Sequence, residues 1–493
     1  MTETELVYPL DTELLRQRSV RGAAITSVSQ VIKFGLMLAS QIILARLLNP
    51  EDFGIIAMIA PVSGLVAVMA DLGIAQAIVQ HATLTRGQLN AVFWVNASLS
   101  VAMASLLMIL SPTLAWLYHE KRLIPVTIAV AALVVVSGLS IQQAALLNRT
   151  MRFSALALSE ILSLAFGLVV SALAAWNGLG YWSLVLGLAA TAGTANAVVW
   201  TASKWRPSWP SFPSDALSML RFGGNVTVSN IALYLNSVLD NGLVGWYLGA
   251  IALGLYDRAW KLAVLPLSQL MAPVNRVAIP TLARLTDHPE RYRNAFSQML
   301  RVLLFASLPG LTVGVSAAQP LIGLLFGARW LAVAPIFSWL CVGSLLTPIN
   351  TAMFWIFLSQ GRSRDQKIYG TAAAIINVFS YIVGLHWGLI GVARTSAIVS
   401  YLLPTPILMW AASRSGPVNK SLLFQLLFPF VLSTMISIAA IDLYGSVFHI
   451  RGFLDLAAVA ILAYVTSTLV FACFSSGRGM IKTIFVAARG FVT

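Results

Sequence analysis

Long apolar stretches separated by short polar segments dominate the sequence. A helix that spans a bilayer needs about 20 mainly apolar residues, and the chain offers such a stretch at about fourteen places. They lie near 22–46, 53–80, 89–117, 123–147, 154–176, 180–203, 219–247, 252–282, 295–316, 331–359, 368–386, 389–412, 422–442 and 452–475. The pattern therefore predicts an all-α integral membrane protein with about 14 transmembrane helices.

Charged residues fix the expected orientation of these spans. Only 10% of the 493 residues are charged, with 31 Lys and Arg against 17 Asp and Glu. With the N-terminus in the cytoplasm, 21 of the 31 basic residues fall in cytoplasmic segments, five in outer loops and five inside spans. Basic residues concentrate on the cytoplasmic side of membrane proteins. We therefore expect an even number of spans and two cytoplasmic termini.

The same composition argues against several other classes of protein. The basic excess is not gathered on one face, as nucleic-acid binding would require. The five histidines are scattered and the two cysteines, Cys341 and Cys473, lie in apolar runs, so no metal site, disulfide or cofactor is expected. No outer loop is long enough to hold a catalytic domain, the longest covering about 317–330. We therefore expect a protein that is not an enzyme.

A weak internal repeat organises the predicted spans. The start of span 7 resembles the start of span 1 at an offset of 200, for example Phe53-Gly54 against Leu253-Gly254. Six spans separate the two copies, so both lobes would share one orientation, as in secondary transporters with parallel repeats. The expected parts are a cytoplasmic tail (1–21), a six-helix lobe (22–203), a proline-rich cytoplasmic linker (204–218), a second six-helix lobe (219–413), two additional helices (414–475) and a cytoplasmic tail (476–493).

The first span carries a polar stripe around Lys33. At 100° per residue, Gln30, Lys33 and Gln41 fall on one face. An ionised lysine at this depth costs about 2.5–3.5 kcal/mol unless it meets water or a partner. Lys33 is therefore either half of a structural Lys–carboxylate pair or a cavity-facing cation for an anionic substrate. Two intramembrane acids, Asp71 and Glu160, are candidates to pair with it or to bind a coupling proton.

Span 7 repeats the stripe with neutral residues. Asn230, Tyr234 and Asn241 share one face, and Asp240 lies near its edge. Such residues hydrogen-bond between neighbouring helices in many bundles. They equally suit a sugar-binding surface, and the pattern does not choose between the two.

Span 8 has the densest positive charge. Arg258, Lys261 and Arg276 share a face, and prolines recur every seven residues at 266, 273 and 280, so a kinked or discontinuous helix is expected. The alternatives for these cations are structural. Asp240 and Arg258 lie at similar depth on either side of a turn near Gly249 and could pair, and Arg276 could extend toward the cytoplasmic face.

Several short motifs resemble those of a known transporter family. They are residues 45–54 (ARLLNPEDFG), 71–77 (DLGIAQA), 253–256 (LGLY) and 326–330 (FGARW). In this order they are similar to the Wzx-type lipid-linked oligosaccharide flippases, the polysaccharide branch of the multidrug/oligosaccharidyl-lipid/polysaccharide exporter superfamily.

The resemblance implies a flippase that works by alternating access. It would move undecaprenyl-pyrophosphate-linked repeat units to the outer leaflet for exopolysaccharide, O-antigen or capsule assembly, with a polymerase and chain-length or export machinery as partners. Lys33, Arg258, Lys261 and Arg276 would hold the pyrophosphate. Gln30, Gln41, Asn230, Tyr234 and Asn241 would contact sugars. A drug/cation antiporter of the same superfamily, a membrane-embedded polymerase or glycosyltransferase, and a scaffold for a biosynthetic complex are the alternatives.

Overall fold

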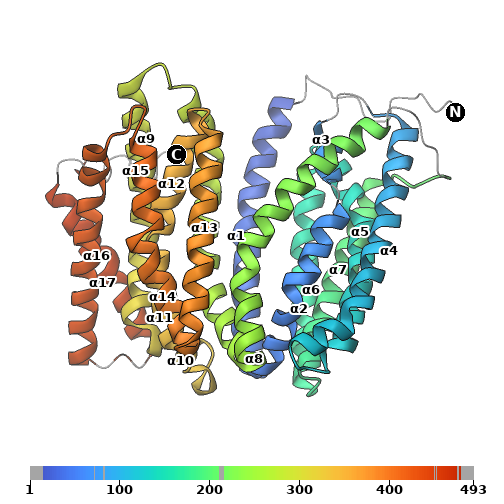
Figure 1. The fold of residues 1–493 in the computed structure, drawn as a ribbon, viewed down its shortest axis with the longest axis horizontal. Helices are drawn as coiled ribbons and strands as arrows, with labels where there is room; N and C mark the ends of the chain where they lie inside the picture. The colour runs from blue at the N-terminus through green and yellow to red at the C-terminus, as the bar shows by residue number, and fades with distance from the viewer. Residues whose placement is uncertain are drawn as a thin grey trace. The chain divides into compact units, whose positions relative to one another are not determined.

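The computed structural model describes residues 15–71, 73–80, 84–209, 216–448, 450, 452–474 and 477–478. Its regular elements are helices throughout this part of the chain (Figure 1). Thirteen helical segments among the described residues are long and apolar enough to cross a membrane. The protein is thus an all-α, multi-pass membrane protein, as the apolar pattern predicts. The figure of about 14 spans stays a prediction, since only the described residues enter the count.

The chain forms two compact units, residues Met1–Gly254 and Leu255–Thr493. The boundary lies inside a long helix and not in the 204–218 linker. It reflects packing alone, so the two six-helix lobes expected from the repeat stay a prediction. Within the described part of the linker, Trp205 is buried, and Asn90 and Trp94 hydrogen-bond to Ser208. This stretch of the linker is therefore packed against the first unit.

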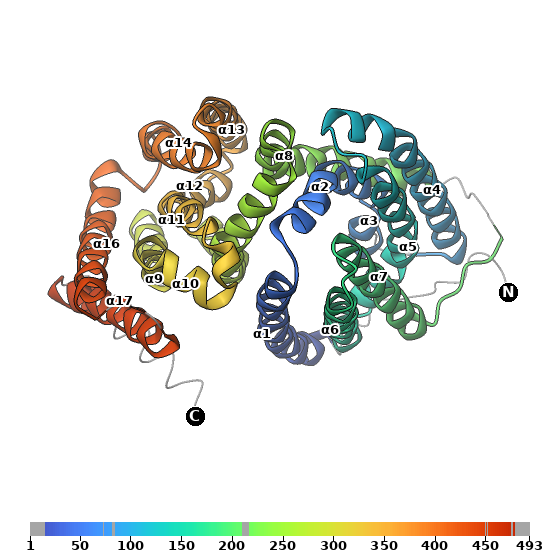
Figure 2. The ribbon, with the colours of Figure 1, turned by 90° about the horizontal axis from the view of Figure 1, so that it is seen from below.

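The first unit is a bundle of long helices joined by short turns. They are α1 (Leu15–Leu47), α2 (Pro50–Asp71), α3 (Ile74–Gln80), α4 (Arg86–Leu117), α5 (Leu123–Arg149), α6 (Phe153–Trp176), α7 (Tyr181–Ser203) and the first part of α8 (Ala216–Ala283). Local sequence sets several ends. Thr85 and Gln88 form a capping box at the start of α4, and positive φ angles at Gly178 and Gly180 turn the chain between α6 and α7. Viewed along the helices, α1 lies beside α6 (Figure 2).

Helix α8 bends at a glycine. Gly249 has φ 83° and ψ −177°, a conformation open to glycine but not to residues with a side chain. The helix then continues through Pro266, Pro273 and Pro280. Gly249 lies at the turn expected between spans 7 and 8. Among the described residues of α8 it is the one with non-helical backbone angles, so the discontinuity expected around the prolines is not observed.

Two glycines allow α2 and α8 to touch backbone to backbone beside this turn. A Cβ on Gly54 would lie 1.8 Å from the carbonyl oxygen of Ala250, and one on Gly254 would lie 1.8 Å from that of Pro50. The contact is reciprocal. Gly54 meets Ala250 and Gly254 meets Pro50, so both the glycines and their partners are 200 residues apart. This geometry agrees with the offset of the sequence repeat. It also explains why both copies need glycine at this position.

The second unit contains the rest of α8 and shorter helices. They are α9 (Pro289–Ser316), α10 (Ala318–Leu325), η1 (Ala328–Trp330), α11 (Val333–Ser344), α12 (Thr347–Ser359), α13 (Ser363–Leu385), α14 (Gly388–Leu402), α15 (Pro404–Ser413), α16 (Lys420–Phe448) and α17 (Phe453–Cys473). Two predicted spans, 331–359 and 389–412, each consist of two helices. Pro348 and Pro404 stand in the first turn of the second helix of each pair, where proline is tolerated because the first N–H groups have no partner within the helix.

Candidate functional site

The first unit places a lysine and a glutamate together inside its helices. Nζ of Lys33 on α1 lies 2.5 Å from Oε2 of Glu160 on α6. Lys33 is 14 residues before the end of α1 and Glu160 is 16 residues before the end of α6. At a rise of about 1.5 Å per residue these are distances of roughly 21 and 24 Å, so the two groups lie at matching depth. Of the two acids that the sequence offered as partners for Lys33, Glu160 is the one in contact.

The two members of this pair differ in accessibility. The Lys33 side chain is 14% exposed, whereas the Glu160 side chain is 52% exposed. The pair removes the penalty of an isolated lysine at this depth. Because the carboxylate is the accessible member, an incoming group reaches Glu160 before it reaches Lys33. The contact agrees with Lys33 as half of a structural Lys–carboxylate pair. It leaves open whether Lys33 also binds an anionic substrate.

The two other candidate acids of the first unit, Asp71 and Asp240, have different surroundings. Oδ1 of Asp71, near the end of α2, is buried without a hydrogen-bond partner among the described residues. Asp240 on α8 is buried, and its Oδ1 accepts a hydrogen bond from the backbone N–H of Asn241 at 2.8 Å. These contacts leave the coupling role of both acids a prediction.

The five neutral candidates for sugar contact fall into different settings. The Tyr234 hydroxyl donates to the Ala60 carbonyl at 2.7 Å and lies over Gly64, so it ties α8 to α2. Oδ1 of Asn241 is buried without a hydrogen-bond partner in the described structure. Gln30, Gln41 and Asn230 are half-buried. Tyr234 has a clear structural contact, and sugar binding by these residues stays a prediction.

The second unit contains a three-residue charge cluster on α8. Asp257 Oδ2 accepts from Arg258 Nη2 at 2.6 Å and from Lys261 Nζ at 2.9 Å. Asp257 and Arg258 are 5% and 7% exposed, whereas Lys261 is 37% exposed. Two positive groups on one carboxylate leave the cluster with a net charge of +1. Its accessible member is the lysine. An anion can therefore reach Lys261 without a rearrangement of the cluster.

Asp257 is the residue that sequence reasoning missed. The span 8 pattern drew attention to the cations, and the acid beside them was not considered. Its spacing carried the signal, because an acid four residues before a lysine is a favourable pair on a helix. Arg258 contacts Asp257, and its predicted pairing with Asp240 stays a prediction. Arg276, the fourth predicted cation, is exposed near the end of α8.

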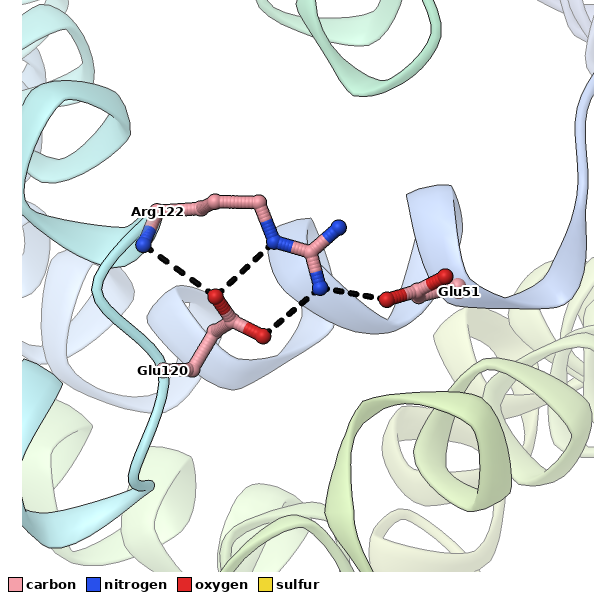
Figure 3. A network of polar contacts seen from close by, with 3 residues as sticks. All are labelled: Glu51, Glu120 and Arg122. Atoms are coloured by element: carbon pink, nitrogen blue, oxygen red, sulfur yellow. Dashed lines mark hydrogen bonds and ion pairs between the residues drawn. The ribbon is translucent and has the colours of Figure 1, made fainter.

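A further charge network ties two turns of the first unit together. The guanidinium of Arg122, just before α5, donates to Glu120 at 2.7 and 2.8 Å and also contacts Glu51 at the start of α2 (Figure 3). Its hydrogen bonds hold the pKa of the Glu120 carboxyl below its usual range, while Glu120 and then Glu51 raise the pKa of Arg122. Both shifts favour the charged forms of Glu120 and Arg122. They link the α1–α2 turn to the α4–α5 turn.

No cluster of three or more His, Cys, Asp or Glu residues able to hold a metal occurs among the described residues. The ion pairs of the described residues include the clusters at Lys33, Arg122 and Asp257 and a pair between Arg362 and Asp365. The clusters at Lys33 and at Asp257 lie inside candidate spans. Both present a lysine amine, a group that suits an anionic ligand.

Residues 43–335, more than half of the chain, match the family described as polysaccharide biosynthesis protein. The chain belongs to this family. It is 25% identical over 437 residues to the lipopolysaccharide biosynthesis protein WzxC of Escherichia coli (85% of this chain, 86% of WzxC). It is 27% identical over 335 residues to the succinoglycan biosynthesis transport protein ExoT of Rhizobium meliloti (67% of each). These relatives confirm the family expected from the motifs.

Solved structures confirm the fold. The lipid II flippase MurJ in an inward closed conformation matches with a TM-score of 0.73 and 16% identity, over 92% of this chain and 98% of MurJ. An inward-facing multidrug resistance MATE transporter of the MOP superfamily matches with a TM-score of 0.59 and 16% identity, over 80% and 98%. The fold is thus that of the exporter superfamily. The relatives are transporters and polysaccharide biosynthesis proteins, in line with a membrane protein that is not an enzyme.

Proposed function

We propose that this protein is a flippase for polyprenyl-pyrophosphate-linked oligosaccharide repeat units. It carries them from the inner to the outer leaflet of the bacterial cytoplasmic membrane by alternating access, for the assembly of exopolysaccharide, O-antigen or capsule. Both termini lie in the cytoplasm, and an undecaprenyl tail stays in the lipid. A polysaccharide polymerase and chain-length or export machinery take up the product outside.

The observation that carries this proposal is the placement of lysine amines inside candidate spans of a polysaccharide transporter. Lys33 and Lys261 each belong to an ion-pair cluster within a span, and Lys261 is partly exposed in a cluster of net positive charge. A pyrophosphate group is doubly charged or more and offers several acceptor oxygens, so it forms strong charge-assisted hydrogen bonds with such groups. Arg258 and Arg276 add positive charge on the same helix. The neutral Gln and Asn side chains suit sugar hydroxyls.

Charge also separates this proposal from a drug/cation antiporter. That function needs a cavity in which acids dominate, because the cargo is positive. Here Asp257 is shared by two cations and Glu160 is already paired with Lys33. The similarity to the MATE transporter therefore supports a common fold and not a common cargo.

Replacement of Lys33 tests the proposed site directly. Lys33→Ala should lower the rate of head-group translocation in proteoliposomes at least tenfold, which corresponds to the loss of about 1.4 kcal/mol of interaction with the phosphates. Lys367→Ala, at the cytoplasmic start of α13, is the matched control and should translocate normally. An unchanged rate in a well-folded Lys33→Ala protein would remove the cationic site from the mechanism.

A further inference from the structure

We infer that Glu160 is a displaceable counter-ion, which occupies Lys33 in the empty transporter and gives way to the phosphate of the substrate. This inference rests on the proposed function and adds a means of release to it. The bound anion competes with a carboxylate that the protein itself supplies. The site can therefore take up its cargo and let it go again.

The geometry of the pair supports such an exchange. Oε2 of Glu160 sits at hydrogen-bond distance from Nζ of Lys33, at 2.5 Å, which is where a phosphate oxygen would sit. The lysine is enclosed at 14% exposure and the glutamate is half exposed at 52%. A long, accessible side chain can turn away more readily than an enclosed one. The carboxylate, and not the amine, is therefore the group that moves.

Electrostatics keeps the free-energy difference between the two states of the exchange small. A lysine inside a span needs a negative partner or water to remain charged. Glu160 supplies that partner when the site is empty, and the phosphate supplies it when cargo is bound. Lys33 is thus paired at both stages, and the energy of binding is the difference between two ion pairs. A transporter that binds through such a difference holds its cargo loosely enough to release it.

No other titratable group of the neighbouring helices competes for Glu160 among the residues whose side chains are described. Helix α6 packs against α1, α5 and α7. In α7 the titratable residue is Tyr181, at its first position, and in α5 it is Arg149, in the last turn, which donates to the Ile78 carbonyl. In α1 the other described cation is Arg46, in the last turn. Lys33 is therefore the charged group in contact with Glu160.

Binding of inorganic pyrophosphate to the purified full-length protein, measured by calorimetry at pH 8, tests the inference. Glu160→Gln should bind about tenfold more tightly than wild type, a change of about 1.4 kcal/mol. In liposomes the same variant should half-saturate at lower substrate concentration and turn over more slowly. Glu160→Asp keeps the carboxylate and should bind less tightly than Glu160→Gln, and Glu290→Gln, at the exposed start of α9, should match wild type.

Two results would overturn the inference, and they separate it from the proposed function. If wild type translocates the lipid-linked oligosaccharide but well-folded Glu160→Gln binds pyrophosphate no more tightly, the counter-ion role is wrong and the flippase stands. If wild type neither binds pyrophosphate nor translocates, the proposed function fails and the inference fails with it.

Discussion

Gly54→Ala is expected to destabilise the protein severely, although it adds a single methyl group. The Cβ of an alanine at this position would lie 1.8 Å from the Ala250 carbonyl oxygen, 2.5 Å from its carbon and 2.9 Å from its Cα. These are backbone atoms, so no side chain can move aside, and α2 and α8 must separate. Overpacking typically costs about 1–3 kcal/mol, and a backbone clash belongs at or above the upper end of that range. Gly254→Ala should behave in the same way, because its contact with Pro50 is the reciprocal one.

Thermal unfolding in detergent, followed by the loss of monodisperse protein, measures this effect. Gly193→Ala in α7 is the matched control, since nothing lies within 4 Å of its added Cβ and alanine favours a helix over glycine by about 1 kcal/mol. The control should be as stable as wild type or more so. Wild-type stability in Gly54→Ala would mean that α2 and α8 do not touch in this way.

Asp257→Asn is expected to have the second large effect. The carboxylate is 5% exposed and holds both Arg258 and Lys261. Removing one member of a buried ion pair costs about 3–5 kcal/mol, because the remaining charge is left buried with less compensation. Arg258 is the buried cation and should account for most of the loss. Lys261, at 37% exposure, can turn toward water.

A double-mutant cycle distinguishes the loss of the Asp257–Arg258 ion pair from a simple packing defect. Arg258→Gln combined with Asp257→Asn should recover much of the stability lost by Asp257→Asn alone, because neither charge is then buried. Asp365→Asn, which removes the acid from a more exposed pair with Arg362, is the control and should cost at most about 1 kcal/mol. Additive losses in the cycle would mean that Asp257 and Arg258 do not stabilise each other.

The apolar pattern predicted most of the fold, because length and hydropathy together define a transmembrane helix. The spans beginning near 89, 123 and 154 have counterparts in α4, α5 and α6 with nearly the same bounds. The pattern did not reveal the breaks before α12 and before α15. Apolar residues run on through both, and the interruption depends on backbone geometry beside Pro348 and Pro404, which hydropathy does not register.

The candidate site was predictable in part. Periodicity placed Lys33 on a polar face, but it could not choose between Asp71 and Glu160, since the choice depends on which helix lies beside α1. Asp257 was missed even though its spacing to Lys261 is local. Tyr234, a polar residue on the predicted polar face, contacts the backbone of α2, which periodicity could not show. The contacts of Lys33 and Tyr234 are made between helices, which a sequence pattern does not show. Asp257 was missed because the cations beside it dominate the pattern.

The central claim is that this protein alone moves a lipid-linked oligosaccharide through recognition of its pyrophosphate. The most direct test uses liposomes that contain only this protein and compares three cargoes: a polyprenyl-pyrophosphate oligosaccharide, the same oligosaccharide on an uncharged lipid, and a cationic drug. We expect the first to appear in the opposite leaflet and the other two to stay where they were added. Transport of the drug, or equal transport of the charged and uncharged lipids, would contradict the claim.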